Sequence, residues 1–171
     1  MTALRWVALL LGAWLLTTAA TEPVLVPEVS QREIQIKYGF TGAELLLFGA
    51  IVYPGGTPPS RDSDIVVILK GPPQSIILRE KQQIAGIWIN AASTEFRSAP
   101  GYYAVASSRP IDKIVDKRTA AIYEFGLSNL QLSPAGSIDP AEQRRFLAGL
   151  VNLNTREGLY KQQDSSVEIM E

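Results

Sequence analysis

The feature that most limits the fold of this chain is the way glycine and proline divide its apolar residues into short runs. The runs are rich in β-branched and aromatic residues, and they span residues 44–53, 64–70, 75–79, 84–90 and 102–107. Segments such as Pro54-Gly55-Gly56 and Gly71-Pro72-Pro73 separate them. Because proline removes a backbone donor and glycine permits tight turns, these segments end a β ladder. Several short strands with this spacing predict a sandwich or barrel.

Three of the predicted strands carry further information. Residues 33–38 alternate strictly between polar and apolar side chains, which predicts a strand with one solvent-exposed face. Residues 44–53 are apolar almost throughout, which favours a strand buried on both faces or near the centre of a sheet. Gly86, inside the run 84–90, is a candidate β-bulge.

The pattern changes to helical spacing in the C-terminal half. Ile111, Ile114 and Val115 indicate one or two short helices within residues 111–130. A stronger helix is predicted from Asp139, which would be the N-cap residue before a proline at the first helical position, and Gly158 is expected to end it. The sequence therefore predicts a mainly β fold, an immunoglobulin-like sandwich or a related one, with helices inserted in the C-terminal half, so α+β overall.

The first twenty residues have the pattern of a secretory signal. Arg5 supplies a positive charge, residues 6–16 are apolar, and small residues follow up to Ala20, after which we expect cleavage. The alternative is an uncleaved anchor, but the apolar run is well short of the ~20 residues that span a bilayer. We expect an exported protein in which residues 21–171 form a single extracytoplasmic domain.

The composition excludes several classes of chemistry. The chain has no cysteine and no histidine, so it can build neither a cysteine nucleophile, nor a Ser-His-Asp triad, nor a histidine or cysteine zinc site. With 16 basic and 17 acidic residues it has no electrostatic signature of nucleic-acid binding. The sequence predicts no metal, no cofactor and no catalytic residues.

The last residues suggest that the chain belongs to a longer protein. Residues 166–170 alternate like the first part of a strand, and the sequence stops one residue later. A strand at a free terminus with no strand after it would leave an unpaired sheet edge. We therefore expect the 171 residues to be truncated at the C-terminus.

Several blocks of sequence, in order, resemble a known family. They are FTGAELLLFGAI at 40–51, KGPPQSIILREKQQIAGIWIN at 70–90, PGYYAVASSRP at 100–110 and REGLY at 156–160. The chain is similar there to the alphaproteobacterial putative transmembrane (Alph-Pro-TM) proteins, which are uncharacterised. The resemblance implies a signal peptide, an extracytoplasmic domain on the periplasmic side of the inner membrane and one C-terminal transmembrane helix, with no established activity. That helix is absent from this chain, which agrees with truncation and leaves membrane anchoring open.

Aromatic residues gather around one segment and provide candidate contact residues. Trp88 is expected in the core. Tyr102 and Tyr103 are consecutive, so on a strand they face opposite ways and one of them is expected to be exposed. Because aromatic side chains are common binding hot spots, we take Tyr102 and Tyr103 as candidate binding residues.

Charged residues offer two further hypotheses. Arg97, Arg109 and Lys113 are candidate residues for holding a small anion or meeting acidic headgroups. Asp112 and Asp116 between the basic residues favour an ordinary mixed-charge helix face instead. Paired acids could hydrolyse glycosides, and the candidates are Glu95, Asp112, Asp116 and Glu124. Ordinary solvated surface acids are the simpler interpretation.

Together these observations favour a non-catalytic function. We expect an extracytoplasmic β-sandwich module of a bacterial membrane-associated protein that contacts another envelope or membrane protein or a component of the cell envelope. The alternative is a small-anion-binding domain or a carboxylate-dependent hydrolase. Converging acids in one pocket would favour the alternative.

Overall fold

The computed structural model describes residues 22–33, 45–56 and 63–170 of the chain. The chain divides into two compact units, Met1–Asp62 and Ser63–Glu171, which are described separately. The predicted signal at residues 1–20 and residues 34–38 of the strand predicted at 33–38 lie outside the described residues. A single domain over residues 21–171 stays a prediction.

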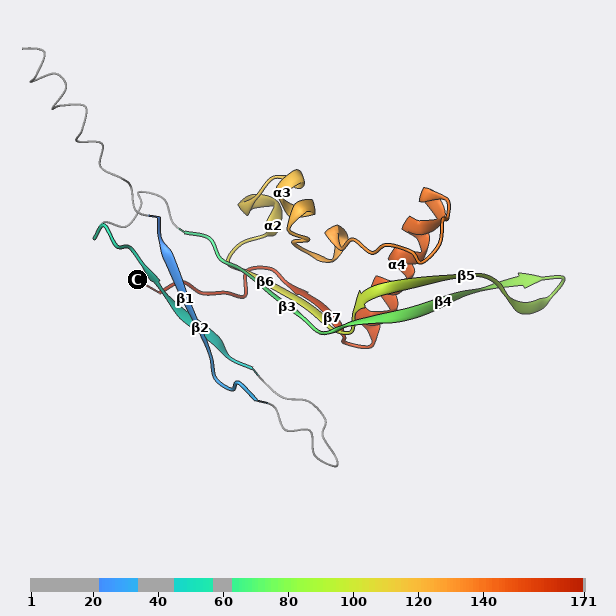
Figure 1. Ribbon diagram of the computed structural model, residues 1–171, viewed down its shortest axis with the longest axis horizontal. Coiled ribbons are helices and arrows are strands. Elements are labelled where there is room, and N and C mark those ends of the chain that lie inside the picture. The colour runs from blue at the N-terminus through green and yellow to red at the C-terminus, as the bar shows by residue number, and fades with distance from the viewer. Residues whose placement is uncertain (1–21, 34–44, 57–62, 171) are drawn as a thin grey trace, which may run out of the picture. The chain divides into compact units, whose positions relative to one another are not determined.

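The first unit contains one antiparallel pair of strands, β1 (Val24–Val29) and β2 (Leu47–Val52) (Figure 1). β2 confirms the strand predicted at 44–53. The expected burial of that strand is wrong, because Leu47, Phe48 and Val52 are about half exposed. A pair of strands has no second layer of its own to cover its faces. Gly49 permits the pairing, since a Cβ at this position would lie 2.5 Å from the Val26 carbonyl oxygen.

The second unit contains a three-stranded sheet in the order β3-β6-β7. β3 (Val66–Lys70) pairs antiparallel with β6 (Tyr103–Ser107), and both strands confirm the sequence prediction. β7 (Tyr160–Gln163), which was not predicted, pairs parallel with β6. Parallel neighbours need a long crossover, and here the helices of the C-terminal half provide it.

The strand predicted at 166–170 does not form. The backbone N–H groups of Ser166 and Val167 both donate to the Ser107 carbonyl, at 2.9 and 3.2 Å, and no ladder continues from there among the described residues. The alternation in this segment is therefore not a strand signal. β7 lies just before it and supplies the pairing with β6.

A long hairpin of β4 (Pro73–Ile84) and β5 (Ile87–Pro100) is the largest element of the second unit (Figure 1). The predicted strands at 75–79 and 84–90 fall within it. Gly86 is not a bulge. It follows Ala85 in the connecting turn, where both residues have positive φ, 50° and 82°, as a two-residue type I′ turn requires. The register shifts lie instead between Gln74 and Ile76 and between Glu80 and Lys81.

The helices form where the sequence predicts them. α2 (Ile111–Ile114), α3 (Lys117–Ile122) and the 3₁₀ helix η1 (Leu127–Asn129) occupy the predicted region, and α4 (Pro140–Arg156) follows Asp139. The Asp139 carboxylate accepts hydrogen bonds from two N–H groups at the start of α4. Gly158, with φ of 73°, ends the helix in a Schellman motif, because its N–H bonds to Thr155 and that of the next residue bonds to Asn154.

The core of the second unit lies where the sheet, the hairpin and α4 meet. Its most deeply buried large side chains are Phe96, Tyr103, Val105, Leu150 and Tyr160. The rings of Tyr103 and Tyr160 pack edge to face, with centroids 6.1 Å apart. The mainly β class with helices in the C-terminal half is confirmed, and the immunoglobulin-like sandwich stays a prediction.

Candidate functional site

The most distinctive surface of the described residues is the end of the β4–β5 hairpin. We call residues 81–91 the distal arm. Every residue in it is exposed, although the same two strands are largely buried on one face nearer their other end. Figure 1 shows the hairpin extending past α4. The distal arm is therefore a projection of the second unit and not part of its core.

The ladder register decides which side chains share a face of the arm. Ile84 pairs with Ile87 and Gln82 pairs with Ile89, so the three isoleucines lie on one face. Along β4, where side chains alternate, this is also the face of Leu78, which packs against the core. Glu80 and Gln82 lie on this face of β4 between Leu78 and Ile84, so the three isoleucines form a separate apolar group at the tip.

Trp88 lies on the opposite face of the arm, paired with Gln83. The expectation that Trp88 belongs to the core is wrong, since its side chain is 64% exposed. The reason is its position. It is the second residue of β5, close to the turn, and it lies on the face that points away from the core. The exposed fractions of Ile84, Ile87 and Ile89 range from 44% to 67%, so exposed apolar side chains lie on both faces of the tip.

Sequence reasoning missed the three isoleucines as surface residues. The available signal was Ala85-Gly86 between two isoleucines. A pair ending in glycine between apolar alternating segments is typical of a two-residue hairpin turn. Interpreting Gly86 as a bulge within one strand concealed the turn, and with it the projection.

The two candidate tyrosines differ in burial. Tyr103 is completely buried, and its hydroxyl donates to the Glu124 carbonyl at 2.5 Å. Burial raises the pKa of the Tyr103 phenol above its ordinary value. Tyr102, just before β6, is half-buried. A contact role for this pair of residues therefore depends on Tyr102, and it stays a prediction.

The three basic candidates lie at separate places and each has a local partner. Arg97 donates to the Ala135 carbonyl at 3.0 Å. Arg109 forms an ion pair with Asp64, with Nε to Oδ1 at 2.8 Å, and it holds the pKa of that carboxyl below its usual range. Lys113 lies 3.8 Å from the Asp112 carboxylate, with both side chains largely exposed. The structure thus gives these cations structural partners, and anion binding stays a prediction.

The acidic candidates likewise have local roles. The Ser75 hydroxyl donates to Glu95 at 2.7 Å, and Glu124 pairs with Lys70. Asp116 caps α3 by accepting from the Thr119 N–H, which lowers the pKa of the Asp116 carboxyl. A lowered pKa is the opposite of what a general acid requires. Among the described residues, no cluster of three or more acidic side chains could hold a metal ion.

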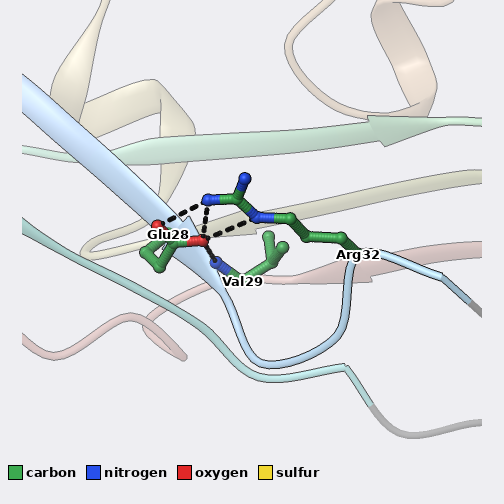
Figure 2. Close-up of polar contacts among 3 residues, drawn as sticks. All are labelled: Glu28, Val29 and Arg32. Carbon is green, nitrogen blue, oxygen red and sulfur yellow. Dashed lines mark hydrogen bonds and ion pairs between the residues drawn. The ribbon is translucent and has the colours of Figure 1, made fainter.

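Two further surface features involve none of the candidate residues predicted from the sequence. A shallow hollow on the β4–β5 hairpin is lined by Arg79, Asn90, Ala91, Ala92 and Ser93. In the first unit, the Arg32 guanidinium donates hydrogen bonds to both carboxylate oxygens of Glu28, at 2.8 and 2.9 Å (Figure 2). This bond, together with the Val29 N–H, lowers the pKa of Glu28. Both side chains are exposed, and exposed pairs of this kind contribute little to stability.

Comparison with known families places the chain in one of them. A model of the family described as "Putative transmembrane protein (Alph_Pro_TM)" matches residues 24–171. The chain belongs to this family, as its sequence blocks predicted. No curated protein and no solved structure matches the chain. In the part of the chain that the structure describes, no helix is long and apolar enough to cross a membrane.

Proposed function

We propose that this chain is an extracytoplasmic module of a bacterial membrane-associated protein, on the periplasmic side of the inner membrane, and that it acts by contact and not by catalysis. The observation that carries the proposal is the distal arm. Monomeric proteins seldom expose contiguous apolar side chains at a projecting tip unless these meet a partner. The family description supports the membrane association, and the N-terminal signal pattern supports export.

The alternative functions have less support from the geometry. Among the described residues, Arg97 donates to the Ala135 carbonyl, Arg109 pairs with Asp64 and Lys113 lies near Asp112, so these partners of the three cations differ. The candidate acids accept from neighbouring hydroxyl and N–H groups. An anion site or a glycosidase needs such groups to converge on one ligand. No specific contact favours either function over contact through the arm.

Export is tested with a reporter enzyme that is active only outside the cytoplasm, fused after Glu171 and expressed in the protein's own cells. We expect activity from the fusion. Replacing Leu9 and Leu10 by arginine interrupts the apolar part of the signal and should abolish it. Equal activity from both fusions would contradict export through this segment.

Contact is tested with a photo-activatable cross-linking residue in place of Trp88 in living cells. The matched control places the same residue at Ile77, which is 60% exposed but lies outside the distal arm. We expect products cross-linked to another molecule of the cell envelope, protein or lipid, from position 88 and not from position 77. Equal labelling at both positions would show that the arm has no special role.

A further inference from the structure

The tip of the distal arm has apolar side chains on both faces. Ile84 and Ile87 lie on one face, Trp88 lies on the other, and a two-residue turn joins them. A protein groove or an added strand covers one face or one edge of a hairpin. A membrane interface can take up apolar side chains from both faces at once, while Gln83, which pairs with Trp88, stays among the polar headgroups. The shape of the apolar surface therefore favours lipid over protein.

The charges around the tip are complementary to an anionic membrane. Lys81 is the one charged residue of the arm, KQQIAGIWINA, and Arg79 lies two residues before it on the same strand face. Glu80 between them is paired with Arg145 of α4 at 3.0 Å. The arm thus carries no carboxylate that anionic headgroups would repel.

The spacing along the strand fits the depth of a bilayer interface. Lys81 lies three residues before Ile84, which at ~3.3 Å per residue is roughly 10 Å. Interfacial elements place their apolar side chains about 5–10 Å into the boundary between headgroups and acyl chains. With Ile84 and Ile87 at that depth, the Lys81 ammonium lies at the level of the phosphates.

We propose that the distal arm inserts its tip into the surface of a phospholipid membrane that contains anionic lipid. This inference rests on the proposed function and names the component that the arm contacts. Ile84, Ile87 and Ile89 enter the boundary region, and Trp88 takes the interfacial position that tryptophan prefers. Lys81 and Arg79 bind the phosphates. The arm stays in the interface and does not cross the bilayer, because a two-stranded hairpin leaves unpaired backbone groups along both edges.

Trp88 can report its own surroundings. The chain has three tryptophans, and the other two, Trp6 and Trp14, lie in the predicted signal. In the full chain with Trp6→Phe and Trp14→Phe, fluorescence comes from the arm even when the signal segment also binds lipid. We expect vesicles of phosphatidylcholine and phosphatidylglycerol to shift its emission to shorter wavelengths. Lipid with brominated acyl chains should quench that emission by at least about twofold.

Variants of the same double-phenylalanine chain separate the tip from the rest of the hairpin. Ile84→Ser with Ile87→Ser should remove the quenching. The matched control, Ile77→Ser, alters an equally exposed isoleucine outside the arm and should retain it. With pure phosphatidylcholine vesicles we expect only weak quenching of Trp88. Lys81→Gln should reduce the quenching by mixed vesicles and leave the weak quenching by pure phosphatidylcholine unchanged. Unaltered circular dichroism would show that each variant is folded.

Several outcomes would overturn the inference. One is a chain that sediments with vesicles while Trp88 remains unquenched. A second is an emission shift that depends on protein concentration without lipid, which would indicate contact with a second copy. A third is a cross-link from position 88 to a protein in cells, which would leave the proposed contact function standing. Quenching by vesicles together with an inactive export reporter would instead overturn the proposed function alone.

Discussion

Each end of the β4–β5 hairpin has a cross-strand pair of large apolar side chains, but the surroundings of the two pairs differ. At the proximal end Ile76 pairs with Phe96, which is completely buried. At the distal end Ile84 pairs with Ile87, and both are more than half exposed. Both pairs lie on the same alternating ladder. The comparison teaches that alternation selects a face of a strand, whereas burial depends on whether another element covers that face.

The boundary between the two ends coincides with α4. Phe146 of this helix belongs to the core cluster that contains Phe96. Beside it, the Arg145 guanidinium lies 5.6 Å from the Phe146 ring centroid and 3.0 Å from Glu80 Oε2, as an ion pair without the alignment of a hydrogen bond. Beyond Glu80, every residue of β4 is exposed. Glu80 and Arg145 therefore mark where coverage by the helix stops.

The largest expected effect on the free energy of unfolding comes from removing a large aromatic side chain, and it should differ between the two ends of the hairpin. Phe96→Ala should lower the free energy of unfolding by about 3–5 kcal/mol, because it empties a fully buried site. Trp88→Ala should lower it by less than about 1 kcal/mol, since only cross-strand contacts are lost. Urea denaturation followed by circular dichroism measures both. Similar losses would break the comparison, because they would show that the arm is buried in solution.

A smaller effect is expected where the base of the hairpin joins β7. The Tyr160 hydroxyl donates to the Pro100 carbonyl at 2.8 Å inside the core. Tyr160→Phe leaves that carbonyl without its partner and should cost about 1–3 kcal/mol of unfolding free energy at neutral pH. The exposed Tyr123→Phe is the control and should cost almost nothing.

For the same variant we expect the loss of stability to depend on pH in the alkaline range. Burial raises the pKa of Tyr160 in the folded protein, and a hydrogen bond with Asn154 opposes this shift. A raised folded pKa means that the contribution of Tyr160 to stability is complete below the unfolded pKa of about 10 and is lost as the pH rises through the folded value. The stability difference between the natural chain and Tyr160→Phe should therefore narrow above about pH 10. A constant difference would contradict a buried, titrating phenol.

The next largest effect is expected from removing the N-cap of α4, the helix that covers the proximal end. The Asp139 carboxylate accepts from the N–H groups of Ala141 and Glu142, at 2.8 and 3.3 Å. Asp139→Ala should lower the unfolding free energy by about 1 kcal/mol, and Asp139→Ser should restore most of the loss. Hydrogen exchange sharpens the comparison, because protection should fall in α4 and at Phe96 while the distal arm is unaffected.

The smallest effect is expected at the turn of the arm. Ala85 has a positive φ of 50°, which alanine adopts at a cost and asparagine tolerates well. Ala85→Asn should stabilise the distal ladder by up to about 1 kcal/mol, measured as slower amide exchange at Gln82 and Ile89, which form a hydrogen-bonded pair of the ladder. Gly86→Ala should act in the opposite direction, because φ there is 82°. Exchange at Phe96 should not change in either variant, and a change there would show that the two ends are coupled.

Much of the secondary structure follows from local chemistry. The strands β3 and β6 form because β-branched runs lie between turn residues, and α4 begins and ends at the residues that its capping chemistry requires. β7 was missed because YKQQ has no apolar alternation. It is a strand only through its pairing with β6. The distal arm was missed because its turn was interpreted as a bulge, and Trp88 was assigned to the core on its residue type alone.

By itself, the sequence determined the mainly β class, the capped helix in the C-terminal half, the family and the absence of cysteine and histidine chemistry, because these depend on composition and on contacts within a few residues. Only the tertiary structure decided that Tyr103 is buried and that Trp88 is exposed. Exposure depends on which distant elements cover a face. Here Tyr160 packs on Tyr103 from 57 residues further along the chain, whereas α4 stops short of the arm. Local periodicity carries no information about such neighbours, so the candidate site became visible only in the folded chain.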